Sequence, residues 1–306
     1  MKTVFLDYRY INFGDLSWKP FEDICDFESY YYTEEEELES RLAEADVIAM
    51  DSYVIDKKVM DAAPKLKLIL PAATGYNNVD LEEAKRRGIA VANVPAYSTD
   101  AVAQHAIALL LGLANSIEPF NDFSRSWAKG QKSETTADVF VRNPMTLLAG
   151  KSIGIVGYGN IGKKVAHIAE ALGMKVNVYS QNPDEAVKSD VVSLHCPLTA
   201  ENTGMVDRSF IEKMKDGAIL INTARGGLVD EKALADALKD GKLAGAGLDV
   251  TAVEPLGEDS PLIDCENCLI TPHVAFMPVE TRQKVIDISA ENLRSFMEGG
   301  DLNRII

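Results

Sequence analysis

The chain has 306 residues, of which 46% are hydrophobic and 25% are charged; this length and composition suit a folded protein with more than one core and argue against disorder. Lys and Arg number 31 against 47 Asp and Glu, a formal net charge of -16, which repels nucleic-acid phosphates and anionic lipid surfaces. No signal-peptide pattern begins the chain and no apolar stretch approaches the roughly 20 residues that span a bilayer, so we expect a cytoplasmic protein without nucleic-acid or membrane partners.

Residues 1–98 alternate short apolar runs with helical segments, which is the pattern of an α/β domain. Strands are predicted at 3–6, 47–50, 66–70 and 89–92, and helices between them at 35–45, 56–63 and 81–87. Thr33 is followed three residues later by Glu36, which predicts a capping box at the start of the first helix.

A long helix is predicted next, after a hinge at residues 95–99, because apolar residues fall on one helical stripe. They are Val102, Ala106, Leu109, Leu110, Leu113 and Ile117. Residues 121–143 are polar and less regular. Strands resume at 153–156, 176–179, 191–194, 218–221, 243–248 and 269–271, and a last helix at 279–297 returns to the first domain.

Gly157, Gly159 and Gly162 form the pattern GxGxxG within GIVGYGNIG, between an apolar strand and a helix that stops at Gly173. Gly157 permits a tight turn, Gly159 lets a pyrophosphate approach backbone N–H groups, and Gly162 lets the helix pack closely on the strand. The start of the helix adds the positive end of its dipole. This context predicts a dinucleotide-binding turn.

The choice between NAD and NADP stays open. An acidic residue that holds the ribose 2′-hydroxyl usually ends the second strand, but here Ser180 stands there. No Arg or Lys beside it would select a 2′-phosphate by charge. Asp184 and Glu185 either disfavour NADP or form the solvated first turn of a short helix, and we favour the helix.

The cysteine pattern does not predict a metal site. Cys265 and Cys268 have the CxxC spacing but lack a second pair of ligands, and Cys268 leads directly into an apolar run. We therefore expect both side chains to fill the core.

Seven motifs along the chain resemble those of the D-isomer-specific 2-hydroxyacid dehydrogenases, in the order of that family. They are ATGYNNVDL (73–81), NVPAYSTDAVAQHAIALLL (93–111), GIVGYGNIG (154–162), SLHCPLT (193–199), NTARGGLVDEKAL (222–234), GLDVTAVEP (247–255) and TPHVAF (271–276). The first two are most similar to the glycerate dehydrogenase and hydroxypyruvate or glyoxylate reductase branch. The resemblance implies a flavodoxin-like substrate domain (1–98 and 278–306), a Rossmann NAD(P)-binding domain (99–277) and a homodimer formed through the long helix and residues 121–143.

The resemblance also implies an oxidoreductase that moves a hydride between NAD(P)H and a small 2-oxo acid or D-2-hydroxy acid. Arg225 is then the residue that binds the substrate carboxylate, for which its planar fork of donors is suited. His273 is the acid and base that exchanges a proton with the substrate oxygen, and Glu254 orients it and keeps it charged. Backbone N–H groups of Thr74 and Gly75 bind the other side of the carboxylate.

Further contacts with the cofactor follow from the same motifs. Asn160 and Ile161 are assigned to the pyrophosphate, Cys196 and Pro197 to the adenosine half, and Thr223, Ala224 and Asp249 to the nicotinamide half. Purely structural roles are the alternatives to cofactor contact. Cys196 is then a small apolar residue after a buried strand, and Asp249 accepts hydrogen bonds within a local turn. Of the other histidines, His167 is expected on a helix surface and His105 packed or at a subunit interface.

Two departures from the family pattern bear on specificity. The stretch 179–190 is shorter than in most relatives, which leaves the adenosine pocket more open. Asp51, Ser52 and Tyr53 stand where relatives of the branch often present an asparagine and a basic residue to the substrate tail, and Phe276 stands where tryptophan is frequent.

Two other functions use the same fold and similar residues. One is a nicotinamide-sensing, corepressor-like binding protein, and the other is a phosphite dehydrogenase. Steady turnover of short 2-oxo acids distinguishes the predicted dehydrogenase from both.

Overall fold

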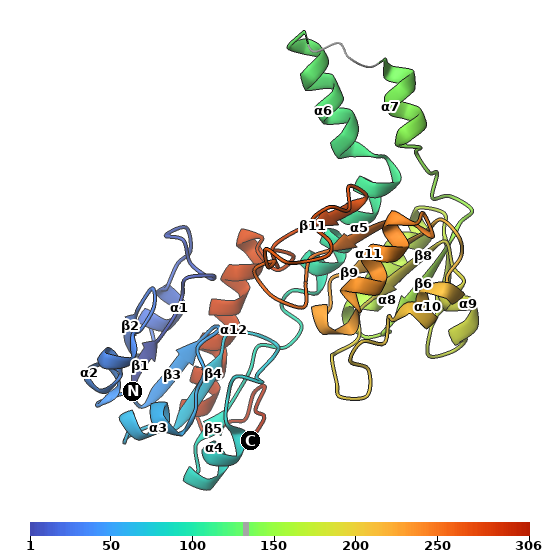
Figure 1. The fold of residues 1–306 in the computed structure, drawn as a ribbon. Helices are drawn as coiled ribbons and strands as arrows, with labels where there is room; N and C mark the ends of the chain where they lie inside the picture. The colour runs from blue at the N-terminus through green and yellow to red at the C-terminus, as the bar shows by residue number, and fades with distance from the viewer. Residues whose placement is uncertain (131–134) are drawn as a thin grey trace. The chain divides into compact units, whose positions relative to one another are not determined.

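The computed structural model describes residues 1–130 and 135–306, and it divides into two compact units, Met1–Ser98 with Phe276–Ile306 and Thr99–Ala275. Each unit is built on one parallel sheet with helices against it (Figure 1). The α/β class predicted from the alternating apolar runs is confirmed.

The first unit has a five-stranded sheet in the order β2-β1-β3-β4-β5. The strands are β1 (Lys2–Phe5), β2 (Asp26–Ser29), β3 (Val47–Met50), β4 (Leu68–Pro71) and β5 (Ala90–Val91). The helices are α1 (Lys19–Glu22), the 3-10 turn η1 (Glu35–Glu37), α2 (Leu38–Leu42), α3 (Lys57–Ala62), α4 (Leu81–Arg87) and α12 (Val279–Met297). Every residue of β3 and β4 is buried, as parallel strands covered on both faces require.

The last helix, α12, packs on this sheet. It buries Val285, Ile286 and Leu293 in the same core cluster as Phe5, and the side chain of Asn292 donates a hydrogen bond to the Asn93 carbonyl at 2.8 Å. The return of the chain to its first unit is thus as predicted. Elements β2 and α1 were not predicted, because their short segments carry few apolar residues in a regular period.

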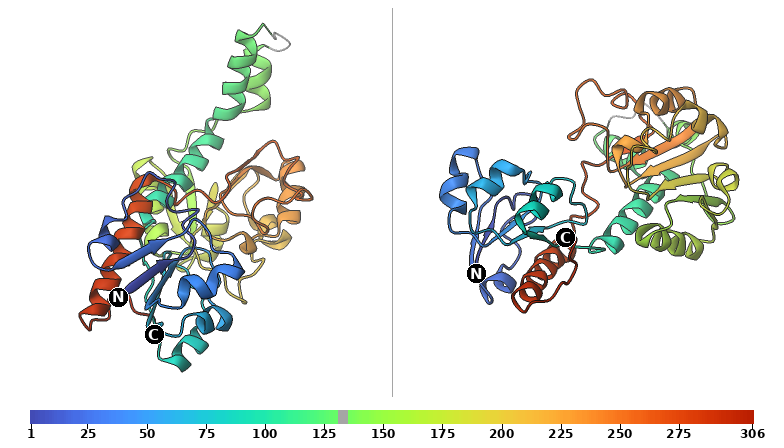
Figure 2. Two further views of the ribbon diagram at one scale, coloured as in Figure 1. Left: turned by 90° about the vertical axis from the view of Figure 1, so that its left-hand side faces the viewer. Right: turned by 90° about the horizontal axis from the view of Figure 1, so that it is seen from below.

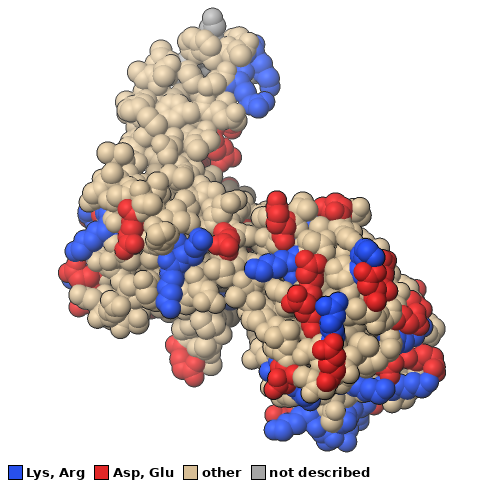
Figure 3. Space-filling model, turned by 180° about the vertical axis from the view of Figure 1, so that it is seen from behind, with Lys and Arg blue, Asp and Glu red and all other residues tan. Residues whose placement is uncertain are grey.

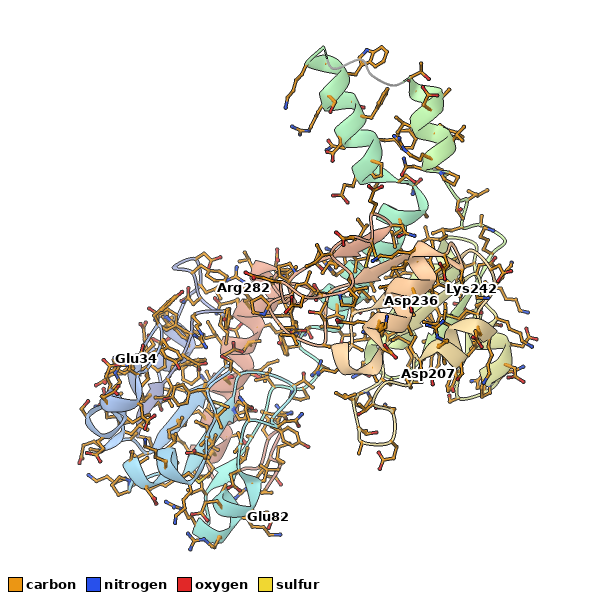
Figure 4. The ribbon with its side chains drawn as sticks, in the orientation of Figure 1. Glu34, Glu82, Asp207, Asp236, Lys242 and Arg282 are labelled. Atoms are coloured by element: carbon orange, nitrogen blue, oxygen red, sulfur yellow. The ribbon has the colours of Figure 1, made fainter. Side chains whose placement is uncertain are left out.

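The capping box before η1 lies one residue later than predicted. Glu34, which is labelled in Figure 4, and Glu37 form it, and the Glu34 N–H donates to a Glu37 carboxylate oxygen at 2.9 Å. Thr33 is instead fully buried, and its hydroxyl donates to the Leu6 carbonyl at 2.8 Å. The Thr33 side chain therefore bonds to Leu6, which is distant in the sequence, and does not cap the helix as the local pattern predicts.

The second unit has a six-stranded sheet in the order β11-β10-β9-β8-β6-β7. The strands are β6 (Ser152–Val156), β7 (Lys175–Val178), β8 (Val191–Leu194), β9 (Ala218–Asn222), β10 (Leu243–Leu248) and β11 (Cys268–Ile270). The helices are α5 (Thr99–Ala114), α6 (Ile117–Ala128), α7 (Thr136–Arg142), α8 (Asn160–Ala171), α9 (Pro183–Val187), α10 (Arg208–Lys213), the 3-10 turn η2 (Gly226–Leu228) and α11 (Glu231–Lys239).

Two predictions for the long helix and the segment after it were wrong. Ile117 does not continue the stripe of α5; it begins α6 and is 57% exposed. Residues 121–143 are mostly helical, in α6 and α7, which lie side by side and project from the rest of their unit (Figure 2). Residues 131–134 of that segment lie outside the described part. The helices were not predicted because Val139 is the one buried residue among their described residues, so no apolar stripe marks a core face.

Within the described residues, no single helix is long and apolar enough to cross a membrane. Helices α5 and α6 pass the same length and composition test only when taken together, and they are bent by 57° at the break between them.

The strand order reverses its direction beside β6, which makes this place a topological switch point of the sheet. The chain runs from β6 to β7 on one side and then to β8 on the other side, so the connections after β6 and β8 diverge at the carboxyl ends of the strands. In open α/β sheets, ligands bind at such a point. The short helix α9 is the only element between β7 and β8, in agreement with the shortened stretch noted in the sequence.

Candidate active site

The turn after β6 needs its glycines for three different reasons. Gly157 has φ +97°, and a Cβ there would lie 2.4 Å from the Cys196 amide nitrogen. A Cβ on Gly162 would lie 2.0 Å from the Gly157 carbonyl oxygen, so the helix packs directly on the turn. Gly159 precedes the first residue of α8 and has no atom within 4 Å of its Cβ position. The space before this helix is therefore open.

These features fit a dinucleotide. The twelve-residue helix α8 presents its N-terminal N–H groups beside Gly159, where a pyrophosphate would be bound without obstruction. Asn160 is exposed at the first position of α8, whereas Ile161 packs partly into the core. The Thr223 hydroxyl, after β9, is buried with no hydrogen-bond partner among the described residues. An unsatisfied donor of this kind suits a polar group of a cofactor.

The adenosine end carries neither a carboxylate nor a cation at the ribose position. Ser180 is exposed one residue beyond Tyr179, at the end of β7. Asn182 caps α9, accepting a hydrogen bond from the Glu185 N–H at 3.3 Å. Asp184 and Glu185 form the first turn of α9, as favoured from the sequence. Cys196 and Pro197 follow β8, and burial raises the pKa of the Cys196 thiol.

His195 lies beside this turn, and its ring is enclosed. Its Nε2 is 2.9 Å from the Ser193 hydroxyl, and its Nδ1 is buried without a partner among the described residues. Burial lowers the pKa of His195 to about 4 from an ordinary 6.5.

This burial predicts a pH dependence of stability. Between pH 6.5 and 4 the unfolded chain takes up a proton at His195 that the folded chain does not, so the free energy of unfolding falls as the pH falls. At about 1.4 kcal/mol per pH unit, the loss between pH 7 and 5 is about 2 kcal/mol. We expect His195→Gln to lose that much less over the same interval in urea unfolding; parallel profiles would contradict the burial of a neutral imidazole.

Arg225 follows β9 on a turn that Asn222 organises. The buried Asn222 side chain accepts from the Ala224 N–H and donates to the Arg225 carbonyl, both at 3.0 Å. The Arg225 side chain is exposed, and its one side-chain hydrogen bond goes to the Ala224 carbonyl at 2.7 Å. No carboxylate of the described residues pairs with it. Arg225 therefore does not form a surface ion pair with any of the described residues, although the protein is rich in carboxylates.

The two glycines after Arg225 allow other loops to approach. A Cβ on Gly226 would lie 1.9 Å from the Thr251 carbonyl oxygen, and one on Gly227 would lie 2.9 Å from the Leu198 side chain. The loop that leads to Glu254 therefore packs directly on the loop that carries Arg225. Sequence reasoning did not assign this role to the glycines, since it depends on a segment that follows the next strand.

His273 and Glu254 form a hydrogen-bonded pair. His273 Nδ1 lies 2.7 Å from Glu254 Oε2, and Glu254 Oε1 accepts from the Thr251 N–H at 3.2 Å. Arg225, Glu254 and His273 follow β9, β10 and β11, which are neighbours in the sheet. Because parallel strands end at the same edge, the structure brings the loops of the three predicted catalytic residues to one edge of the second unit.

Asp249 is buried and bonded to the loop that contains His273. Its carboxylate accepts hydrogen bonds from the Thr271 hydroxyl and from the N–H groups of Val274 and Ala275. Burial alone would raise the pKa of Asp249, but the hydrogen bonds from His105, Thr271 and these N–H groups hold it below its usual range. His105, expected to be packed or at a subunit interface, lies in this network, whereas His167 is on the surface of α8, as predicted.

Thr74 and Gly75 belong to the first unit, in the loop after β4, and both are exposed. The Thr74 hydroxyl donates to the Val94 carbonyl at 2.9 Å, and the Asn93 side chain donates to the Thr74 carbonyl at 2.8 Å. These two bonds fix the loop.

Asp51 and Ser52, two of the residues that depart from the family pattern, are held by Asp7, which lies two residues after β1. The Asp7 carboxylate accepts from the N–H groups of Asp51 and Ser52 at 2.8 and 2.9 Å. Burial, with Asp7 nearby, raises the pKa of Asp51 to about 7. Tyr53 packs beside Tyr32, with ring centroids 5.8 Å apart. The expected effect of these residues on the substrate tail stays a prediction.

Cys265 and Cys268 are part of the core, as expected. Cys265 is buried in the main cluster of the second unit and Cys268 packs against that cluster. Burial raises the pKa of the Cys268 thiol to about 12, so this group is a poor metal ligand near neutral pH.

Comparison with known proteins gives a consistent result. Residues 107–275 match the family model described as D-isomer specific 2-hydroxyacid dehydrogenase, NAD binding domain. The chain is 41% identical to a hydroxypyruvate reductase of Blautia hydrogenotrophica, with 99% of each chain covered. It is 37% identical to a glycerate dehydrogenase of Methylorubrum extorquens, with 99% of this chain and 98% of the relative covered. A D-lactate dehydrogenase structure from Aquifex aeolicus, complexed with NAD and lactic acid, has 29% identity and a TM-score of 0.78 over 97% of this chain and 96% of its own.

Proposed function

Because this chain belongs to the D-isomer-specific 2-hydroxyacid dehydrogenases and is an NAD-dependent oxidoreductase, we propose that it reduces hydroxypyruvate, glyoxylate or a similarly short 2-oxo acid. The observation that carries the proposal is that the exposed Arg225 has no carboxylate partner among the described residues. Arg225 follows β9, and the neighbouring strands β10 and β11 lead to Glu254 and His273, which are hydrogen-bonded to each other. When bound, NADH supplies the hydride and NAD accepts it.

Arg225 is the group that binds the substrate carboxylate. Its guanidinium offers parallel donors that match the two oxygens of a carboxylate, and one edge of the fork also reaches an adjacent carbonyl oxygen. This grip orients the carbonyl carbon for hydride transfer. An anion is bound locally despite the net charge of -16, because no acidic side chain of the described residues neutralises Arg225.

His273 is the proton donor in reduction and the proton acceptor in oxidation. Negative charge grows on the carbonyl oxygen as the hydride arrives, and an imidazolium delivers a proton to that oxygen. Glu254 Oε2 lies 2.7 Å from Nδ1, which leaves Nε2 as the atom that exchanges the proton. Binding of the carboxylate by backbone N–H groups of Thr74 and Gly75 stays a prediction from the family resemblance.

A substrate panel tests the proposal. We expect the purified chain to oxidise NADH in the presence of hydroxypyruvate or glyoxylate, followed by the absorbance of the reduced nicotinamide, with pyruvate and a dicarboxylic 2-oxo acid as comparisons. Parallel assays with NADPH test cofactor choice, for which Ser180 offers no charge discrimination. Binding of NADH without turnover of any 2-oxo acid would favour the sensor, and phosphite-dependent NADH formation would favour the phosphite dehydrogenase.

A homodimer through α6 and α7 is the proposed assembly. Large apolar side chains are exposed there, with Ile117, Trp127, Phe140 and Val141 between 41% and 81% accessible. The face of this region seen in Figure 3 carries few charged side chains. Exposed apolar surface of this kind marks a protein interface. A monomer in sedimentation equilibrium at micromolar concentration would contradict the assembly.

A further inference from the structure

The backbone at His273 is in an unfavourable conformation and must be held there. Its φ is +54°, in the left-handed region that residues with a Cβ rarely occupy. Such conformations persist where the surroundings over-determine them. The His273 N–H donates to the Asp249 carbonyl at 2.8 Å and contacts the Thr271 carbonyl at 3.0 Å.

The Asp249 carboxylate accepts hydrogen bonds from residues on both sides of His273. One carboxylate oxygen accepts from the Thr271 hydroxyl at 2.6 Å and from the Val274 N–H at 2.9 Å. The other accepts from the Ala275 N–H at 2.9 Å. Asp249 is only 1% exposed, so these bonds lie away from competing water. A single buried carboxylate thus fixes the loop two residues before and two residues after the imidazole.

His105 joins this network from α5, a different part of the chain. Its Nε2 lies 2.8 Å from the Thr271 hydroxyl oxygen and 3.4 Å from an Asp249 oxygen. Thr271 has one hydroxyl proton, which goes to the Asp249 carboxylate at 2.6 Å. Its oxygen is therefore the acceptor towards His105, and His105 Nε2 must carry a proton. Helix α5 has 16 residues and buries half of them, so it provides a rigid support for this donor.

We propose that His105 is a positioning residue for the reaction: from α5 it donates a hydrogen bond to Thr271, which fixes the Thr271–Asp249 pair and, through it, the loop that aims His273. This inference rests on the proposed function. His105 does not touch the reacting atoms, so its loss slows the proton and hydride transfer while cofactor binding is kept.

The test uses two substitutions at His105 and one at Thr271. His105→Leu removes the donor and keeps a side chain that suits a helix, whereas His105→Gln places an amide N–H near the position of Nε2. Thr271→Val removes the hydroxyl without changing the shape of the side chain. The matched control is His167→Leu, at an exposed position of α8.

We expect His105→Leu to lower kcat by about 10-fold, with KM for the 2-oxo acid and NADH binding changed by less than about 3-fold. The deuterium isotope effect on kcat with 4-deuterated NADH should rise, since the chemical step becomes more limiting. His105→Gln should recover most of the rate. Thr271→Val should lower kcat similarly, and the double variant with His105→Leu should be no slower than the slower single variant, because both remove one connection.

Other results would overturn the inference. An unchanged kcat in His105→Leu would overturn it. A lower kcat with an unchanged isotope effect and an equal loss of NADH-binding sites would also overturn it, because that result indicates fewer folded molecules. Additive losses in the double variant would separate His105 from Thr271. A wild-type chain that reduces no 2-oxo acid would overturn the proposed function itself, and the variants would not be needed to show it.

Discussion

Replacement of His273 by Asn is expected to lower kcat for 2-oxo acid reduction by about 100- to 10,000-fold, the usual contribution of a positioned general acid. An amide has no proton to give to the developing alkoxide near neutral pH, although its size allows the loop to keep its path. Asn also tolerates the left-handed conformation at φ +54° better than most residues. Stopped-flow absorbance of NADH at a saturating concentration of 2-oxo acid measures this loss.

Two further variants interpret that result. Glu254→Gln keeps a hydrogen bond to His273 Nδ1 but removes the charge of the partner, so we expect a smaller loss of kcat than in His273→Asn. His167→Asn, on the exposed surface of α8, should behave like the wild-type protein. Activity of His273→Asn within 3-fold of wild type would remove His273 from the reaction.

Replacement of Arg225 by Lys is expected to lower kcat/KM for 2-oxo acids by about 10- to 100-fold, or about 1.5 to 3 kcal/mol, with the affinity for NADH little changed. A lysine keeps the positive charge but presents a single point of contact, which cannot hold the carboxylate and orient the carbonyl together. Steady-state kinetics and NADH fluorescence titration give the two quantities separately.

Arg208 offers the matched control for this substitution. It is an exposed arginine of the same unit, and it is paired at 2.7 Å with Asp236, which is labelled in Figure 4. Exposed pairs of this kind contribute little to stability. Arg208→Lys should therefore leave the kinetics unchanged. If Arg225→Lys also kept the wild-type efficiency, the carboxylate would be bound by another group.

The local patterns that were predicted best are those that rest on backbone geometry and continuous apolar runs. The strands Val47–Met50, Val191–Leu194 and Leu243–Leu248 and the helix Val279–Met297 have the predicted bounds. The glycine turn of GIVGYGNIG needs φ +97° at Gly157 and the absence of a Cβ at Gly162, which the spacing itself indicates. These features depend on neighbours in the chain.

The features that were predicted wrongly or not at all depend on distant partners. Thr33 was assigned to a helix cap, but the Leu6 carbonyl accepts its hydroxyl from another element. Helices α6 and α7 bury only Val139 among their described residues, so their apolar residues do not form the buried stripe that predicts a helix.

The candidate active site was also predictable only in part. The sequence by itself determined which residue types occur and, through resemblance, that Arg225, Glu254 and His273 were candidates. Only the tertiary structure showed that Arg225 lacks a carboxylate partner in the described residues, that Glu254 meets His273 at 2.7 Å, and that Asp249 and His105 support the loop behind them. The physical reason is that hydrogen bonds and ion pairs act over a few ångströms, and parallel strands bring their ends to one edge only after the chain has crossed the sheet.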